Sequence, residues 1–281
     1  MKHAIISAAA IAAALTAVPV AAEDGPTVRI EHAVARVVVI VEERADIAVE
    51  IEQGRSGLTA LQVSRRNNDV IIKGDLRGGD ALRNCQSGSG GALQPGEDAS
   101  VDVRDLGTVK LADAPLIVLR TPRAVKVNVE SGAVFGSVGR NASSIQLASG
   151  GCGDWTIADT AGDMLLVTMG SGDMRAGTSG RLAADIMGSG NIRAGATRGL
   201  QANVMGSGDI SAVRVDGPVE VNVMGSGDTN IPDTVASIQA IIMGSGDIHV
   251  AGATGAVTRG GTGSGQIVIA GQAMRPGRDT R

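Results

Sequence analysis

Aromatic side chains are almost missing from this 281-residue chain, which contains one tryptophan, one phenylalanine and no tyrosine. A globular enzyme of this length normally buries many aromatic rings, because they supply area and shape to a large core. Glycine, in contrast, occurs 41 times. A thin core of Ala, Val, Ile and Leu is typical of a solenoid, in which narrow layers repeat along one axis.

Long apolar runs are also missing after the first 22 residues. Residues 1–22 have the pattern of a secretory signal, because Lys2 and His3 precede an apolar stretch that ends in the small-residue site Val20-Ala21-Ala22. The stretch is shorter than the roughly 20 residues of a membrane span. The sequence therefore predicts an exported protein that is periplasmic, on the cell surface or secreted, with no transmembrane segment after signal removal.

The chain also lacks an excess of basic residues. Removing Lys2 with the signal leaves 24 of the 25 basic residues against 29 acidic ones, a net charge of about −5. Nucleic-acid binding depends on positive charge facing the phosphates. We therefore expect no nucleic-acid partner.

Only two cysteines occur, Cys85 and Cys152. An even pair in an oxidising compartment favours a disulfide, and two unpaired buried thiols are the alternative. Closing the separation of 67 residues (152 − 85) would stabilise the fold by roughly 4 kcal/mol on the chain-entropy model. No histidine lies near either cysteine in the sequence, so we expect a structural bond and not a catalytic thiol.

The sequence is rich in one repeated pentapeptide, Met-Gly-Ser-Gly-Asp, with Asn in the last place of one copy. Its methionines advance by 18, 18, 19 and 19 residues, and a period near 20 indicates one structural unit stacked on copies of itself. Weaker copies begin at Gly151 and Gly263. The methionines are Met169, Met187, Met205, Met224 and Met243, and the glycines are Gly170, Gly172, Gly188, Gly190, Gly206, Gly208, Gly225, Gly227, Gly244 and Gly246.

Between the pentapeptides, apolar and polar residues alternate, as in Val219, Val221 and Val223, and this alternation predicts half-buried strands. A shorter strand follows each pentapeptide, and a second Gly- or Pro-rich corner closes the unit. The glycines beside the serine suit a corner that needs positive φ or close backbone approach. We therefore predict an all-β, single-stranded β-solenoid with about 18–19 residues per coil, an architecture that favours surfaces over a pocket.

The first half also has β patterning, with a predicted hairpin of residues 61–64 and 69–73 through Arg66-Asn67-Asn68. A Gly/Ser/Pro-rich insertion at 84–100 contains Cys85. The predicted divisions are the signal peptide at 1–22, an N-terminal β region of the solenoid at 23–125, the repeat β-helix at 126–270 and a disordered tail at 271–281.

The valine-rich start, the strand at 125–129 and the serial Gly-Ser-Gly-Asp/Asn corners resemble the head GIN domain family over residues 28–270. This family is described as auto-transporter adhesin heads and as a domain of unknown function. The resemblance implies a right-handed parallel β-helix and an adhesin-like activity. Family corners often carry Ser before Gly-Ser-Gly, where this chain carries Met.

Stacking would align an acidic ladder along one corner. Unit charges ~5 Å apart repel by about 1 kcal/mol even in water, so something must offset that repulsion. One possibility is that each carboxylate accepts backbone N–H bonds in its own corner. The other is a row of Ca²⁺ ions. The candidate residues are Asp154, Asp173, Asp209, Asp228 and Asp247, and the ladder is interrupted by Asn191 and Gln266.

The five methionines would stack as well. Strict alternation places them on the outward side, where they would form an apolar contact stripe. A bend at the adjacent corner could instead turn them inward as core or corner packing. Binding of a soft metal such as Cu(I) by thioethers is a third possibility.

Catalysis is not expected. The outward series Arg175, Arg193, Ser211, Asn230 and His249 contains no carboxylate pair, and the sugar-stacking aromatics of polysaccharide-cleaving β-helices are missing. We therefore predict a non-catalytic, exported, adhesin-like or envelope-associated module without a cofactor. Its partner would be an unknown protein or glycan of the cell envelope. The alternatives are a polysaccharide-active enzyme and a structural element that self-associates end to end through exposed strand edges.

Overall fold

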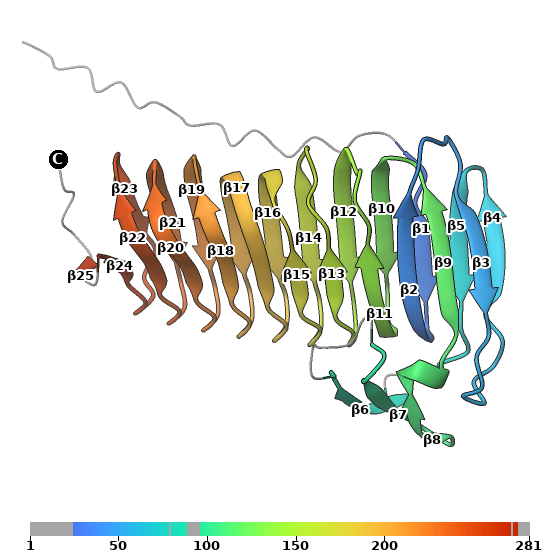
Figure 1. Cartoon of the computed structure of the whole chain (residues 1–281). Coiled ribbons are helices and arrows are strands. Elements are labelled where there is room, and N and C mark those ends of the chain that lie inside the picture. Colours follow the sequence, from blue (N-terminus) through green and yellow to red (C-terminus); the bar gives the residue numbers. More distant parts are fainter. Residues whose placement is uncertain (1–24, 79, 89–95, 271, 275–281) are drawn as a thin grey trace, which may run out of the picture.

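The computed structural model describes residues 25–78, 80–88, 96–270 and 272–274, and its regular structure is almost entirely β (Figure 1). The predicted signal peptide, residue 271 and residues 275–281 lie outside the described residues. Within the described ranges the one helical element is a single 3-10 turn, η1 (Leu111–Asp113). That turn is far too short to cross a bilayer, and no other described segment forms a membrane-spanning helix.

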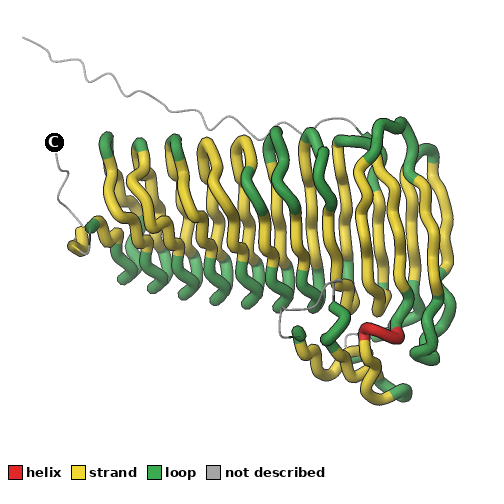
Figure 2. Tube along the Cα trace, viewed as in Figure 1, coloured by secondary structure: helices red, strands yellow, loops and turns green. Residues whose placement is uncertain are grey.

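The strands wind into a parallel β-solenoid of about 8 turns, which confirms the predicted fold class (Figures 1 and 2). Each regular coil gives one strand to each of two faces, and β17 (Ile192–Val204) runs through both. Face 1 also contains β10 (Ala124–Val129), β12 (Ser144–Ser149), β14 (Met164–Thr168), β16 (Ser179–Ile186), β19 (Pro218–Val223), β21 (Ser237–Ile242) and β23 (Val257–Gly260). Face 2 also contains β11 (Gly132–Val138), β13 (Trp155–Ile157), β15 (Met174–Ala176), β18 (Ile210–Val215), β20 (Thr229–Val235), β22 (Ile248–Ala253) and β24 (Ile267–Ile269).

Parallel register aligns equivalent side chains from coil to coil. Val204 is paired with Val223, and Val223 with Ile242, and all three are buried. Alternate residues of these strands therefore point into a narrow core between the faces, as the alternating sequence pattern predicts. Both aromatic residues of the chain, Trp155 and Phe135, are buried as well, with 1% and 2% of their surface exposed.

The chain does not wind in simple order at its beginning. β1 (Val28–Glu31) lies between β5 (Asp69–Lys73) and β10, while β2 (Ala33–Val41) lies between β9 (Leu116–Thr121) and β11. The first two strands are thus inside the stack and are held on both sides. Two antiparallel strands, β3 (Ala48–Glu52) and β4 (Gln62–Arg66), cover the end by pairing with β9 and β5. The β4–β5 pair confirms the predicted hairpin, with Asn67 at φ 56° in its turn.

The opposite end is closed by one side chain and one short strand. Arg259 of β23 occupies the inward column next to the buried Ala240. Its guanidinium Nη2 donates hydrogen bonds to the carbonyl oxygens of Gly263 at 2.7 Å and Gly265 at 2.8 Å. The core therefore ends on a hydrogen-bonded polar group, as the terminal repeat of a solenoid requires.

Part of the predicted disordered tail is ordered. Residues 272–274 form β25 (Gln272–Met274), which pairs antiparallel with β24. The physical reason is that the last strand of face 2 presents unpaired backbone groups at its edge, and a following segment can satisfy them by turning back. The prediction of disorder is wrong for these three residues.

A second, three-stranded sheet lies beside the solenoid, and we call it the lateral sheet (Figure 1). It consists of β6 (Leu82–Gln86), β7 (Ser100–Val103) and β8 (Gly107–Lys110). Its buried Val101 and Val109 share a separate apolar cluster with Val34, Ala133 and Phe135, which project outward from β2 and β11. The predicted insertion at 84–100 thus begins in β6, and residues 89–95 of it lie outside the described part.

Candidate functional site

The Gly-Ser-Gly corners form a row of loops along one edge of the solenoid (Figure 2). A Cβ added to Gly206 would overlap the carbonyl oxygen of Gly188 in the preceding coil, and one added to Gly208 would overlap that of Gly190. The same clash recurs at all ten corner glycines, and none of the ten has φ in the left-handed region. Close approach between coils, and not positive φ, is therefore what demands glycine here.

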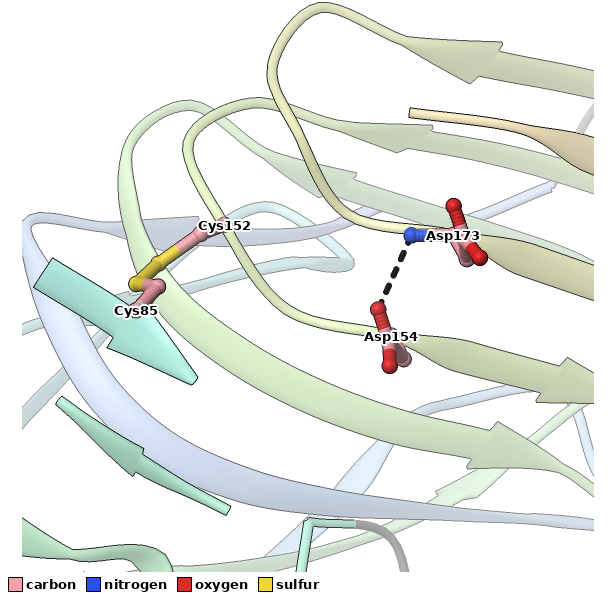
Figure 3. Close-up of a disulfide and its surroundings, with 4 residues drawn as sticks. All are labelled: Cys85, Cys152, Asp154 and Asp173. Atoms are coloured by element: carbon pink, nitrogen blue, oxygen red, sulfur yellow. Dashed lines mark hydrogen bonds between the residues drawn. A yellow bond between two sulfur atoms is a disulfide. The ribbon is translucent and has the colours of Figure 1, made fainter. Parts of the chain in front are cut away.

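The acidic ladder is held by hydrogen bonds between coils. Asp154 Oδ1 accepts the backbone N–H of Asp173 at 2.9 Å (Figure 3). In each later coil the Oδ1 atom of the ladder residue likewise accepts the backbone N–H of the next ladder residue, at 2.7–2.9 Å. The acceptor and donor pairs are Asp173 and Asn191, Asn191 and Asp209, Asp209 and Asp228, Asp228 and Asp247, and Asp247 and Gln266. The expectation that each carboxylate would cap its own corner is wrong, because the N–H within reach belongs to the next coil.

This arrangement explains why Asn can replace Asp in the ladder, since both side chains offer an oxygen acceptor. Over the described ranges, no group of three or more His, Cys, Asp or Glu side chains is placed to hold a metal ion. The calcium hypothesis has no geometric support from the ladder, whose Oδ1 atoms already accept hydrogen bonds. We assign the ladder a structural role.

The opposite corner contains two carboxylates with a similar role, and one of them is Asp163, whose Oδ1 accepts the backbone N–H of Arg181 in the next coil at 2.7 Å. Asp159 Oδ1 accepts the backbone N–H of Thr178 at 2.7 Å and its hydroxyl at 3.0 Å. These two hydrogen bonds, the backbone bond first, hold the pKa of Asp159 below its usual value, although burial opposes the shift.

The five pentapeptide methionines lie at the surface. Each follows directly on a face 1 strand, and its N–H donates to a carbonyl of the preceding coil at 2.8–2.9 Å, so the row keeps the strand register. The exposed fractions rise along the row from 42% at Met169 to 55% at Met243. Core packing is thereby excluded for this row, although Met164 and Met174 elsewhere are fully buried. We call the row the methionine stripe.

The outward columns beside the stripe are mostly uncharged. They are formed by Leu165, Ala183, Gln201, Glu220 and Gln239, and by Val167, Asp185, Asn203, Asn222 and Ile241. Asn222 Nδ2 donates to Asn203 Oδ1 at 2.8 Å, and Asn203 Nδ2 donates to Asp185 Oδ1 at 2.6 Å. This amide ladder fixes its own side chains, and the exposed large apolar groups of the face are the five thioethers and Ile241.

Face 2 carries the series considered for catalysis. Pairing places Arg175, Arg193, Ser211, Asn230 and His249 in one column, as the repeat spacing predicts. Arg193 forms an ion pair with Asp173 at 3.1 Å in the neighbouring acidic column. The column itself contains no carboxylate, so it offers no acid and base pair for glycoside cleavage.

The two cysteines form a disulfide, with their Cα atoms 6.4 Å apart (Figure 3). Cys152 occupies the serine place of the first, weaker corner copy, where the side chain points away from the core. Cys85 lies on β6. The bond therefore ties the lateral sheet to the solenoid through a corner that otherwise follows the repeat.

A cleft that the sequence did not predict lies beside this disulfide, with a volume of about 350 Å³. β6 lines one side, and the corners of successive coils line the other. On the solenoid side the hydroxyl of Ser131 lies 2.8 Å from Nδ1 of His32, which has a φ of 52°. No repeat signal marks this cleft, because its two walls come from segments far apart in the sequence.

Comparison with known proteins assigns the chain to a family. The family model described as "Putative auto-transporter adhesin, head GIN domain" matches residues 30–215. The chain belongs to this family. The head GIN match includes the lateral sheet and ends with β18, so the last two pentapeptide copies, those of Met224 and Met243, lie beyond it.

The chain is also similar to two solved crystal structures, each described as a "putative adhesin". The one from Bacteroides fragilis is 15% identical, with 89% of this chain and 94% of that chain covered and a TM-score of 0.48. The one from Parabacteroides distasonis is 13% identical, with the same coverage and a TM-score of 0.49. No curated protein matches the chain.

Proposed function

We propose that this head GIN protein is an exported, non-catalytic, adhesin-like binding module that contacts an envelope protein through its methionine face. We define the methionine face as the methionine stripe together with the two columns beside it. The observation that carries this proposal is the stripe, a straight row of five thioether side chains that are 42–55% exposed. A contiguous apolar row on a soluble surface is typical of a contact site.

We propose a protein partner and not a glycan because the chain exposes no aromatic ring among its described residues. Glycan-binding surfaces stack sugars on exposed rings, whereas both rings of this chain are buried. Methionine suits protein contacts, because its flexible and polarisable side chain adapts to irregular apolar surfaces. A rigid β-sheet holds the backbone of the stripe straight, so little backbone conformational entropy is lost on binding.

The ends of the solenoid bear on the alternative of end-to-end assembly. Antiparallel strands β3 and β4 cover one end, and β25 with the Arg259 hydrogen bonds covers much of the other. Covered ends are the means by which solenoids avoid stacking on one another. These features favour a lateral contact over filament growth.

The test uses the mature chain, residues 23–281, on an array of immobilised envelope proteins and glycans. We expect saturable retention on protein with no product detected by mass spectrometry. A variant with all five stripe residues changed Met→Ser should lose retention, because serine removes the apolar surface. The matched variant with all five changed Met→Leu should keep it.

Arg175→Ser on face 2 is the control for unspecific surface effects and should bind as the native chain does. Circular dichroism must first show that each variant keeps its β content. Retention that survives the Met→Ser change would contradict the proposed face. A product released from any glycan would favour the enzyme.

A further inference from the structure

We propose that the methionine stripe binds a soft monovalent metal ion, Cu(I) or its close analogue Ag(I), between thioethers of neighbouring coils. Thioether sulfur is a soft ligand that selects such ions over hard cations. Parallel pairing puts equivalent backbones ~4.8 Å apart, and the stripe follows that pairing through its backbone hydrogen bonds. Flexible side chains on adjacent coils can therefore turn two sulfurs toward one ion.

The stripe differs in residue type from the column beside it. That buried column consists of the β-branched residues Thr168, Ile186, Val204, Val223 and Ile242. At the exposed position the chain uses methionine in all five copies. Each of these coils therefore places one thioether at the surface, in register with the thioethers of its neighbours.

Competing soft ligands are few. Both cysteines are joined in the disulfide, and Met164 and Met174 are fully buried. Met1 belongs to the predicted signal peptide, which leaves Met274 as the remaining methionine outside the stripe. The nearby columns hold amides and two carboxylates, which prefer hard ions.

Binding forms dative bonds from neutral sulfur atoms to the ion. A thioether has no proton to lose, so the reaction releases none and involves no change of oxidation state. The pH dependence of the affinity therefore gives a second readout, beside the affinity at one pH. Ligation by a histidine ring would weaken in acid, because a proton and the metal ion compete for the ring nitrogen, whereas thioether ligation keeps its affinity.

The experiment titrates the mature protein with Ag(I) by calorimetry in a chloride-free buffer and with Cu(I) by competition against a chromophoric chelator. We expect at least one ion per chain, with the same affinity from about pH 5 to pH 8. Loss of partners around a metal ligand already costs about 10- to 100-fold in affinity. The variant with all five stripe residues changed Met→Leu should therefore bind at least about 100-fold more weakly.

Met274→Leu is the matched control and should bind as the native chain does. Native-like binding by the five-fold Met→Leu variant, or no binding by the native protein, would overturn the proposal. An affinity that falls with acid would assign the ion to histidine and overturn it as well. The same Met→Leu variant keeps its apolar stripe, so it should still be retained on the partner array, which separates failure of the metal site from failure of the adhesin-like function.

Discussion

The repeat coils and the lateral sheet reach stability in different ways. From β14 to β22 each coil repeats the same inward column, the same glycine corner and the same hydrogen bond from a backbone N–H of the next coil to an Asp or Asn side chain. The lateral sheet has no such internal repetition. Its cluster is completed by residues from β2 and β11, and its covalent link is one disulfide. Stability is distributed along the coils and concentrated at a few non-local contacts in the sheet.

The largest expected effect comes from removing the disulfide with the double variant Cys85→Ser and Cys152→Ser. Serine at 152 restores the Gly-Ser-Gly corner of later coils, so the solenoid itself should be preserved. The lateral sheet should lose up to roughly 4 kcal/mol of stabilisation on the chain-entropy model. In hydrogen exchange, β6, β7 and β8 should lose protection while β16 to β22 do not. Unchanged protection in β6 to β8 would show that apolar packing alone holds the sheet.

A single methyl group in a corner should damage the coils nearly as much. In Gly206→Ala the new Cβ would overlap the carbonyl oxygen of Gly188, and the backbone must shift. We expect a loss of about 3 kcal/mol in the free energy of unfolding, measured with urea. Ser207→Ala in the same exposed corner should stay within about 0.5 kcal/mol of the native value. Equal effects of the two changes would contradict the close approach between coils.

A smaller effect is expected in the acidic ladder. Asp228→Ala removes the acceptor for the N–H of Asp247 and should cost about 1 kcal/mol. Asp228→Asn keeps an oxygen acceptor, as the natural Asn191 does, and should be nearly neutral. The thermal midpoint should be the same in chelator and in millimolar Ca²⁺. A midpoint raised by calcium in the native chain but not in Asp228→Asn would revive the metal hypothesis.

The smallest effect concerns pH. Because the pKa of Asp159 is lowered in the folded state, its stabilisation is present above the unfolded pKa and is lost as pH falls through the folded pKa. Asp159→Asn should therefore be slightly less stable than the native chain at pH 7. The difference should disappear in strong acid, as followed by thermal unfolding. A difference that is independent of pH would assign the effect to packing and not to the charge.

The sequence predicted the coils well because their information is local and repeated. The register of Val204 with Val223, the two faces and the hairpin at Asn67 all follow from alternation, spacing and turn residues. The placement of the methionine stripe could not be decided, because strict alternation and a bend at the corner give opposite answers for a residue at a strand end.

What the sequence could not show depends on contacts between distant segments. The insertion of β1 and β2 inside the stack, the lateral sheet and the cleft beside Cys85 all arise from non-local pairing. For the acidic ladder, the sequence suggested hydrogen bonds within one corner, but each carboxylate accepts an N–H of the next coil. The spacing identifies which residues stack, but not which N–H each carboxylate reaches. Arg259 could have been noticed as a charged residue in an apolar place of the repeat.

Oxidation footprinting tests the central claim most directly, namely that the five pentapeptide methionines form an exposed row, whereas Met164 and Met174 are buried in the solenoid. The mature protein would be treated with dilute hydrogen peroxide, and methionine sulfoxide would be quantified at each site by mass spectrometry. We predict rapid oxidation of Met169, Met187, Met205, Met224 and Met243 and protection of Met164 and Met174. Equal rates at both sets, or protection of the row in the absence of any partner, would contradict the account.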